Sequence, residues 1–238
     1  MHALPERGLK DVEILGYFLD LKNEKLLATL QKRQESKIRK TTRQVELIER
    51  NGYMIPIGEV VEKARVPRRI HIWEVLQQHN PNIIREEFFS RTGYGGSWYV
   101  EEDFTITVED CVRLIKDAEG VPVVAHPGCY NERFRTESLL RDENTFNVLR
   151  TCVNAGACGI EVFYPYHKER PYYNRGSSLI TNEQYMELIA SYKEAADDYR
   201  VVMTGGSDFH GDYKRQICMG EVEIPEWVLT KLRAAVEE

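Results

Sequence analysis

The strongest constraint on the fold is the alternation of short apolar segments with helical segments in the second half of the chain. Three segments have the length and composition of buried strands: 121–125 (VPVVA), 159–164 (GIEVFY) and 200–204 (RVVMT). Helical patterns occupy residues 143–154 and 181–198 between them. Apolar strands that alternate with helices predict a parallel sheet covered by helices, and therefore an α/β fold.

Local signals set the ends of several helices. Thr107 can cap a helix that ends at Gly120, and Thr181 with Gln184 forms a capping-box signature for the helix that follows them. Near the N-terminus, residues 12–19 (VEILGYFL) read as a buried strand. These signals extend the strand and helix pattern to both halves of the chain.

Residues 22–105 have a different character. A long helical segment over 24–50 ends at Asn51-Gly52, and residues 56–78 predict a second helical hairpin. Basic residues are frequent between 32 and 43, which favours a solvated helix surface over a nucleic-acid contact. We therefore expect a mostly helical lobe at 22–105, inserted into the α/β domain.

Composition narrows the class of protein. The 238 residues carry 32 Lys+Arg against 38 Asp+Glu, and no apolar stretch is long enough to span a membrane. The N-terminal residues lack the apolar core of a signal peptide, so a cytoplasmic protein without a membrane partner is expected. The five cysteines lack the paired spacing of a thiolate zinc site.

Histidines follow all three apolar segments of the second half. His126 comes directly after the first, His167 follows the second, and Asp208 and His210 follow the third. Functional residues of parallel α/β folds gather beyond the carboxyl ends of the strands. In extended backbone, Asp208 and His210 would point to the same side, and imidazole with carboxylate suits Zn, Mn or Fe. The pattern predicts a metal-dependent hydrolytic site at this rim.

Several motifs, in order along the chain, resemble the PHP (polymerase and histidinol phosphatase) family and its stand-alone metal-dependent phosphoesterases. They are EILGY at 13–17, RRIHI at 68–72, AHPG at 125–128, GIEV at 159–162 and TGGSDFHG at 204–211. The resemblance implies a distorted (β/α)7 TIM-like barrel with an inserted helical lobe. It also implies a cluster of two or three divalent metal ions (Mn, Zn or Fe) that hydrolyses phosphate esters, including nucleotides and short nucleic acids.

The resemblance also assigns roles to individual residues. His126, Asp208 and His210 match metal-binding positions, and Glu13 stands where the family motif has a histidine, so it is a further candidate ligand. Positions associated with the substrate phosphate are matched by Arg69 and His71; a guanidinium offers phosphate a bidentate fork. Two residues remain open: Glu161 as a supporting carboxylate or a direct ligand, and His167 as a ligand or an exposed loop residue. No residue is assigned as a certain catalytic group.

Some family motifs do not occur in this sequence. The opening HxHxxxSDG, TDH and GxE segments are absent, and Glu101-Glu102 replaces a basic residue of the family. The resemblance therefore implies an incomplete barrel, built from residues 1–21 and 106–238, that starts before the fourth family strand. A fragment, one half of a split protein and a degenerate paralogue all fit this pattern. A sheet without its first strands calls for a partner, either a second copy or a separate N-terminal half.

Three functions remain open on the sequence. The first is a metal-dependent phosphoesterase of the PHP type that acts on nucleotides or short oligonucleotides, incomplete or inactive as this chain alone. The second is a non-catalytic binding or scaffold module derived from that fold. The third, a metal-dependent amidohydrolase, is disfavoured because no lysine stands at a strand end to be carbamylated.

Overall fold

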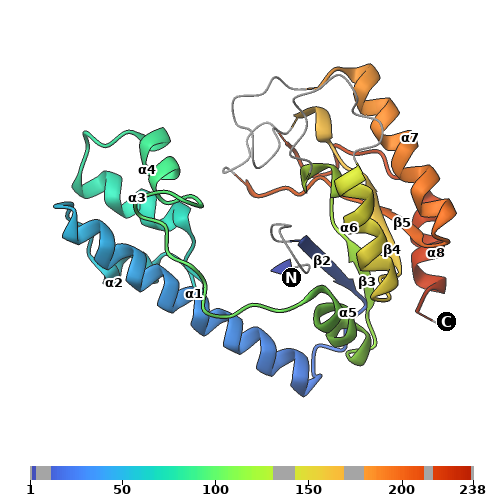
Figure 1. Cartoon of the computed structure of the whole chain (residues 1–238), viewed down its shortest axis with the longest axis horizontal. Coiled ribbons are helices and arrows are strands. Elements are labelled where there is room, and N and C mark those ends of the chain that lie inside the picture. Colours follow the sequence, from blue (N-terminus) through green and yellow to red (C-terminus); the bar gives the residue numbers. More distant parts are fainter. Residues whose placement is uncertain (1, 4–11, 131–142, 169–179, 212–216, 237–238) are drawn as a thin grey trace. The chain divides into compact units, whose positions relative to one another are not determined.

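The chain divides into two compact units. The computed structural model describes residues 2–3, 12–130, 143–168, 180–211 and 217–236. One unit, here the sheet unit, comprises residues 1–26 and 106–238, and the other, the helical unit, comprises residues 27–105 (Figure 1). The fold is a mixed α/β fold, in agreement with the predicted class.

The described strands of the sheet unit form one sheet in the order β1-β2-β3-β4-β5. The strands are β1 (His2–Ala3), β2 (Val12–Tyr17), β3 (Val121–Val124), β4 (Gly159–Phe163) and β5 (Val202–Gly205). The predicted parallel pairing is confirmed for β3 with β4 and for β4 with β5. The carboxyl ends of these three strands therefore meet at one rim of the sheet.

A wholly parallel sheet, however, is the wrong prediction for β2. This strand pairs antiparallel with β3, with Ile14 opposite Val124 and Tyr17 opposite Val121. An apolar segment does not encode its direction, and the long helical insertion between the two strands removes the constraint of a short crossover connection. As a consequence, the beginning of β2 lies beside the carboxyl end of β3, at the rim where the site residues were predicted.

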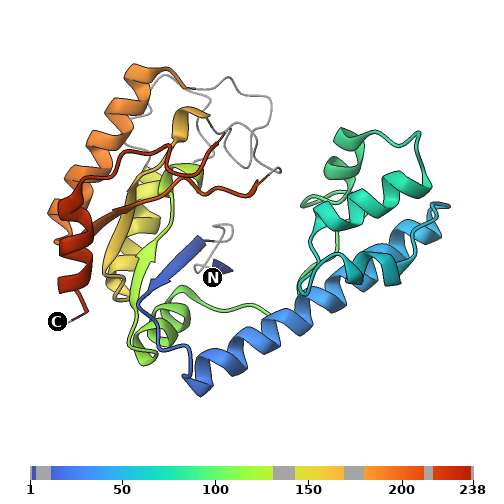
Figure 2. The same ribbon diagram turned by 180° about the vertical axis from the view of Figure 1, so that it is seen from behind.

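Helices accompany the strands in the described part of the sheet unit (Figure 2). They are α5 (Val108–Asp117), α6 (Glu143–Asn154), α7 (Asn182–Asp198) and α8 (Glu226–Ala234). The largest apolar cluster joins the strand residues Ile14, Val124 and Ile160 to buried residues of α5, α6 and α7. A separate cluster packs Leu232 of α8 against Val121 of β3. Burial of these apolar side chains stabilises the packing of the helices on the sheet that carries the site.

The predicted helix caps are confirmed. The Thr107 hydroxyl accepts a hydrogen bond from the Asp110 N–H at 3.0 Å, at the start of α5. At the start of α7, Thr181 Oγ1 accepts from the Gln184 N–H, and Gln184 Oε1 accepts from the Thr181 N–H. These bonds pair backbone donors that the first helical turn leaves without an intrahelical partner.

The helical unit contains most of α1 (Glu24–Arg50), with α2 (Ile57–Glu62), α3 (Arg69–His79) and α4 (Arg85–Arg91). Its core is rich in aromatic side chains, among them the buried Trp73, Phe88 and Trp98. Among the described residues, none of the helices is both long and apolar enough to cross a bilayer. The predicted limits of α1 are confirmed, whereas α4 was not predicted.

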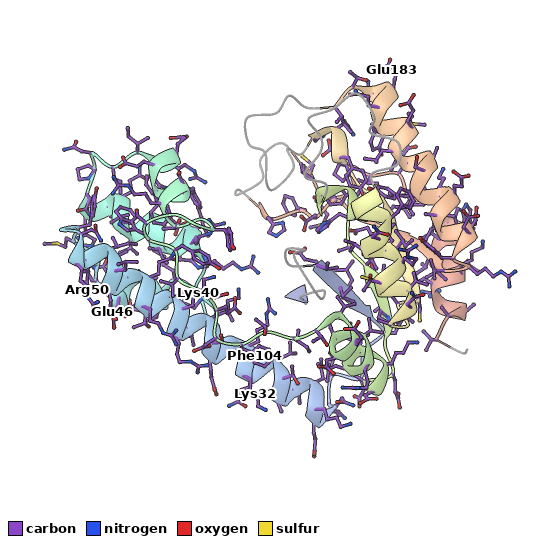
Figure 3. The ribbon with its side chains drawn as sticks, viewed as in Figure 1. Lys32, Lys40, Glu46, Arg50, Phe104 and Glu183 are labelled. Carbon is purple, nitrogen blue, oxygen red and sulfur yellow. The ribbon has the colours of Figure 1, made fainter. Side chains whose placement is uncertain are left out.

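Part of the basic face of α1 is paired within the helical unit. Asp103 accepts hydrogen bonds from Ser36 Oγ at 2.5 Å, Arg39 Nε at 2.8 Å and Arg43 Nη2 at 2.6 Å. Figure 3 shows Phe104 on the segment beside α1, where its N–H donates to Ser36 Oγ. The helix face that was predicted to be a solvated surface therefore also binds the segment that contains Asp103 and Phe104.

Candidate functional site

His126 occupies the position just beyond the carboxyl end of β3. Its side chain is 3% exposed, and its Nε2 lies 2.9 Å from Glu13 Oε2. The antiparallel pairing of β2 explains this contact, because the Ala125 N–H donates to the Glu13 carbonyl at 3.0 Å. The sheet therefore brings together two of the predicted metal-binding residues.

Glu161 supports the backbone at His126. It lies on β4 and is 5% exposed, and its Oε2 accepts the His126 N–H at 3.0 Å. Its Oε1 would lie 3.0 Å from a Cβ at Gly206, so this glycine leaves room for the carboxylate. Glu161 thus supports the backbone of a predicted metal-binding residue through this hydrogen bond.

Burial and neighbouring charges shift the pKa values at this site. Burial raises the pKa of Glu161 to about 7, with Asp208 and Glu13 adding to the increase and His126 opposing it. Burial lowers the pKa of His126, but its contacts with Cys129 and Glu13 outweigh burial and raise the value to about 11. Both pKa shifts arise because ionisable groups lie close together where burial excludes most of the water.

Asp208 joins this group through Tyr164. The Tyr164 hydroxyl donates to Asp208 Oδ2 at 3.4 Å, and the Tyr164 ring lies 5.0 Å from the His126 ring. Asp208 adopts a positive φ of 50°, a conformation that is uncommon outside glycine. Only its place directly after β4 could have identified Tyr164 as a residue of this site.

His210 is near Asp208, but for a different reason from the predicted one. Its Nδ1 lies 2.6 Å from the Asp208 carbonyl oxygen and 3.4 Å from Asp208 Oδ1. The left-handed backbone at Asp208 is not extended, so the strand alternation expected for this D-x-H pair is wrong. The imidazole is turned back on the turn itself, and its side chain is 38% exposed.

The two residues predicted to hold the substrate phosphate lie in the helical unit. Arg69 and His71 share the first turn of α3. His71 Nδ1 accepts the Arg68 N–H at 3.0 Å, and the Arg69 guanidinium lies 5.7 Å from the centre of the Phe89 ring. Burial lowers the pKa of His71. His71 therefore has a helix-capping role within the helical unit.

His167 lies apart from the contacts around His126. It follows β4 in a short 3₁₀ turn, and its ring centre is 4.4 Å from that of Tyr185. The described contacts thus bring together Glu13, His126, Glu161 and Asp208. His167 packs on an aromatic ring instead.

The side chains of this site are of the kinds that bind divalent metal ions. Imidazole and carboxylate are ligands that Mn, Zn and Fe accept. Within the part of the chain that the structure describes, however, no three His, Cys, Asp or Glu side chains are grouped to hold a metal ion. The side chains present are of the types that bind these metals, but the described residues are not arranged as a complete metal site.

Comparison with known proteins places this geometry in context. No family model matches the chain. The phosphoribosyl 1,2-cyclic phosphate 1,2-diphosphodiesterase of Eggerthella lenta is 27% identical over 224 residues, which cover 88% of this chain and 70% of that protein.

Two solved structures share the fold. A protein from Bifidobacterium adolescentis, described as a metal-dependent phosphoesterase, superposes with a TM-score of 0.70 and 22% identity, over 98% of this chain and 73% of its own. An amidohydrolase from Chromobacterium violaceum, solved with bound sulfate and no metal, has a TM-score of 0.67 and 21% identity, over 94% and 72% of the two chains. The two structures show the fold of this chain, and the names of the sequence relative and of one structure agree with the class of enzyme that the motifs resemble.

Proposed function

We propose that this chain is a metal-dependent hydrolase of phosphate esters and that its active site is the rim group of Glu13, His126, Glu161 and Asp208. The observation that carries the proposal is the grouping of three carboxylates near His126 at the carboxyl ends of the strands. Glu13 contacts the imidazole of His126, and Glu161 accepts its backbone N–H. Asp208 accepts from the hydroxyl of Tyr164, whose ring lies 5.0 Å from the His126 ring. The names of the sequence relative and of one structural neighbour support the same class of reaction.

The charge of the rim group argues for a cation-dependent reaction. The rim group has three carboxylates and one imidazole, so it is negative when its carboxylates are ionised, and a phosphate ester would be repelled from it. Bound divalent cations would reverse that repulsion and supply Lewis-acid chemistry.

The residues of the chain have distinct proposed tasks. Asp208 and His126 are the donors that the proposal places next to the substrate, with Glu13 beside His126 and His210 at the exposed edge of the turn. Glu161 positions the backbone at His126. As substrates we propose nucleotides or short oligonucleotides. Arg69 and His71 stay candidates for the substrate phosphate.

The proposal is tested by a phosphoesterase assay on the whole chain. Hydrolysis of bis(4-nitrophenyl) phosphate and of nucleoside monophosphates is measured after chelation and again after addition of Mn, Zn or Fe. Activity should return only with metal, and Asp208→Asn should lower it at least about 100-fold. The matched control Asp198→Asn, at the exposed end of α7, should leave activity unchanged. Equal loss or equal retention in both variants would overturn the assignment of Asp208.

One observation favours a second candidate, a non-catalytic binding module of the same fold. The Glu13 carboxylate and the His126 imidazole, both candidate ligands, are already engaged with each other at 2.9 Å. A module of this kind would bind at most one ion and would hydrolyse none of the phosphate esters. The same assay, combined with metal analysis, separates it from the enzyme.

A further inference from the structure

We propose that the sheet unit carries a second binding site, between α7, β5 and α8, for a small aromatic anion. A cavity of about 420 Å³ opens there, lined by Lys193, Asp197, Met203, Trp227 and Lys231. This volume is in the range of pockets that bind small organic molecules. The residues differ from those of the rim group, so the site is independent of the proposed phosphoesterase function.

Trp227 supplies a fixed aromatic wall. Its ring packs edge-on against Phe163, with the centroids 6.4 Å apart and the planes at 71°. Phe163 is only 7% exposed, whereas Trp227 is 40% exposed. The indole is therefore held by the core on one side and open on the other. Because the Trp227 ring already packs against Phe163, stacking a planar ligand on it costs little side-chain entropy.

Two lysines place positive charge at the same cavity. Lys231 Nζ lies 5.0 Å from the centre of the Trp227 ring, and Lys193 Nζ lies 5.1 Å from the centre of the Phe163 ring. Within the described part of the chain, neither ammonium group takes part in an ion pair. Their charges are thus held at aromatic faces and remain available to an anion.

The third charged group defines the ligand further. Asp197 also lines the cavity, so two cations face one carboxylate and the cavity keeps a net positive charge. This contrasts with the chain as a whole, whose net charge is −6. A carboxylate or phosphate on the ligand would lie near the lysines, its aromatic ring would stack on Trp227, and Asp197 could accept an N–H from that ring.

The test uses fluorine NMR on the whole chain labelled with 5-fluorotryptophan. The sequence has three tryptophans, and the Trp227→Phe variant identifies the signal of Trp227. Titration with 1-naphthoate should shift that signal saturably and leave those of the buried Trp73 and Trp98 in place. The neutral probe 1-naphthalenemethanol should bind more weakly. A Trp227 signal that does not respond to 1-naphthoate would overturn the proposal.

Charge-removing variants test the role of the lysines. Lys193→Gln and Lys231→Gln should each weaken binding of 1-naphthoate about fivefold, the effect expected for one partly exposed charge pair. The control Lys22→Gln removes a lysine that is likewise exposed but lies outside the cavity, and it should have no effect. Circular dichroism confirms that each variant is folded. Unchanged affinity in both cavity variants would contradict an anion site.

Discussion

Glu13 Oε2 lies 2.9 Å from Nε2 of His126, and the direction of β2 is the reason. Because β2 runs antiparallel to β3, its first residues meet the last residues of β3. A parallel β2 would have put Glu13 at the opposite end of the sheet. The side chains are 27% and 3% exposed, so water screens this pair only in part.

Glu13→Gln should destabilise the metal-free chain. Contacts with Cys129 and Glu13 raise the pKa of His126 in the folded state from 6.5 to about 11, against the effect of burial. The stabilisation from both contacts is therefore full below pH 6.5 and is lost as the pH rises through about 11. A partly buried charged hydrogen bond of this kind contributes about 1–3 kcal/mol. In urea unfolding after chelation, the free energy of unfolding of Glu13→Gln should be lower than that of the wild type by this amount at pH 6, about half a pH unit below the ordinary imidazole pKa. The difference should be smaller at alkaline pH.

The exposed Glu223→Gln substitution is the control for this measurement, since it removes the same charge without a contact to His126. If the cost of Glu13→Gln were to grow with pH, the imidazolium would not be the form that Glu13 stabilises.

Gly206→Ala should destabilise the sheet unit by crowding Glu161. An added Cβ would lie 3.0 Å from Glu161 Oε1, whose carboxylate also holds the His126 N–H. The expected loss is about 1 kcal/mol in the free energy of unfolding. Gly58→Ala is a matched control, because nothing lies within 4 Å of its added Cβ and Gly58 is inside α2. That substitution should stabilise the chain by about 0.5–1 kcal/mol, and equal effects of the two would contradict the crowding.

Asp103→Asn should lower the stability of the helical unit at neutral pH. Hydrogen bonds from Arg39 and Ser36, opposed in part by burial, hold the pKa of the Asp103 carboxyl well below its usual 3.8. Because the folded pKa is depressed, this stabilisation is present above pH 3.8 and is lost as the pH falls further. The midpoint of urea unfolding should therefore differ between wild type and variant at neutral pH and converge in strong acid. A difference that persists there would mean that the asparagine disturbs packing.

We also propose that the chain associates with a second copy or with another chain through its sheet. In the order of the described strands, β5 and the two-residue β1 are at the edges, and an edge strand offers unpaired backbone groups to a partner. Sedimentation velocity should show a concentration-dependent rise in mass. A stable monomer over the same concentrations would count against self-association and leave a different partner chain to be sought.

Local signals in the sequence were sufficient for much of the secondary structure. The limits of α1 and α6 and the caps at Thr107 and Thr181 depend on residues close together in the chain, and all are confirmed. The strand-end rule likewise identified His126 and Asp208 as residues of one rim. These features are readable because periodicity and capping act over a few residues.

Features that depend on distant residues could not be predicted. The direction of β2 depends on its pairing with β3, and the whole helical unit separates these two strands in the sequence. The contact between Arg39 and Asp103 likewise joins residues that are 64 positions apart. The D-x-H prediction was wrong because a left-handed residue, Asp208, interrupts the extended backbone that it assumed. Side chains that meet only through tertiary structure leave no periodic signal in the sequence.

If the rim group is a cation-dependent active site, the purified chain must bind metal through it. The chain is loaded with Mn or Zn, dialysed against metal-free buffer and analysed for bound metal per chain, beside His126→Asn and Asp198→Asn. We expect tightly held metal in the wild type and in Asp198→Asn, and its loss in His126→Asn. No bound metal in the wild type, or the same amount in all three, would contradict it.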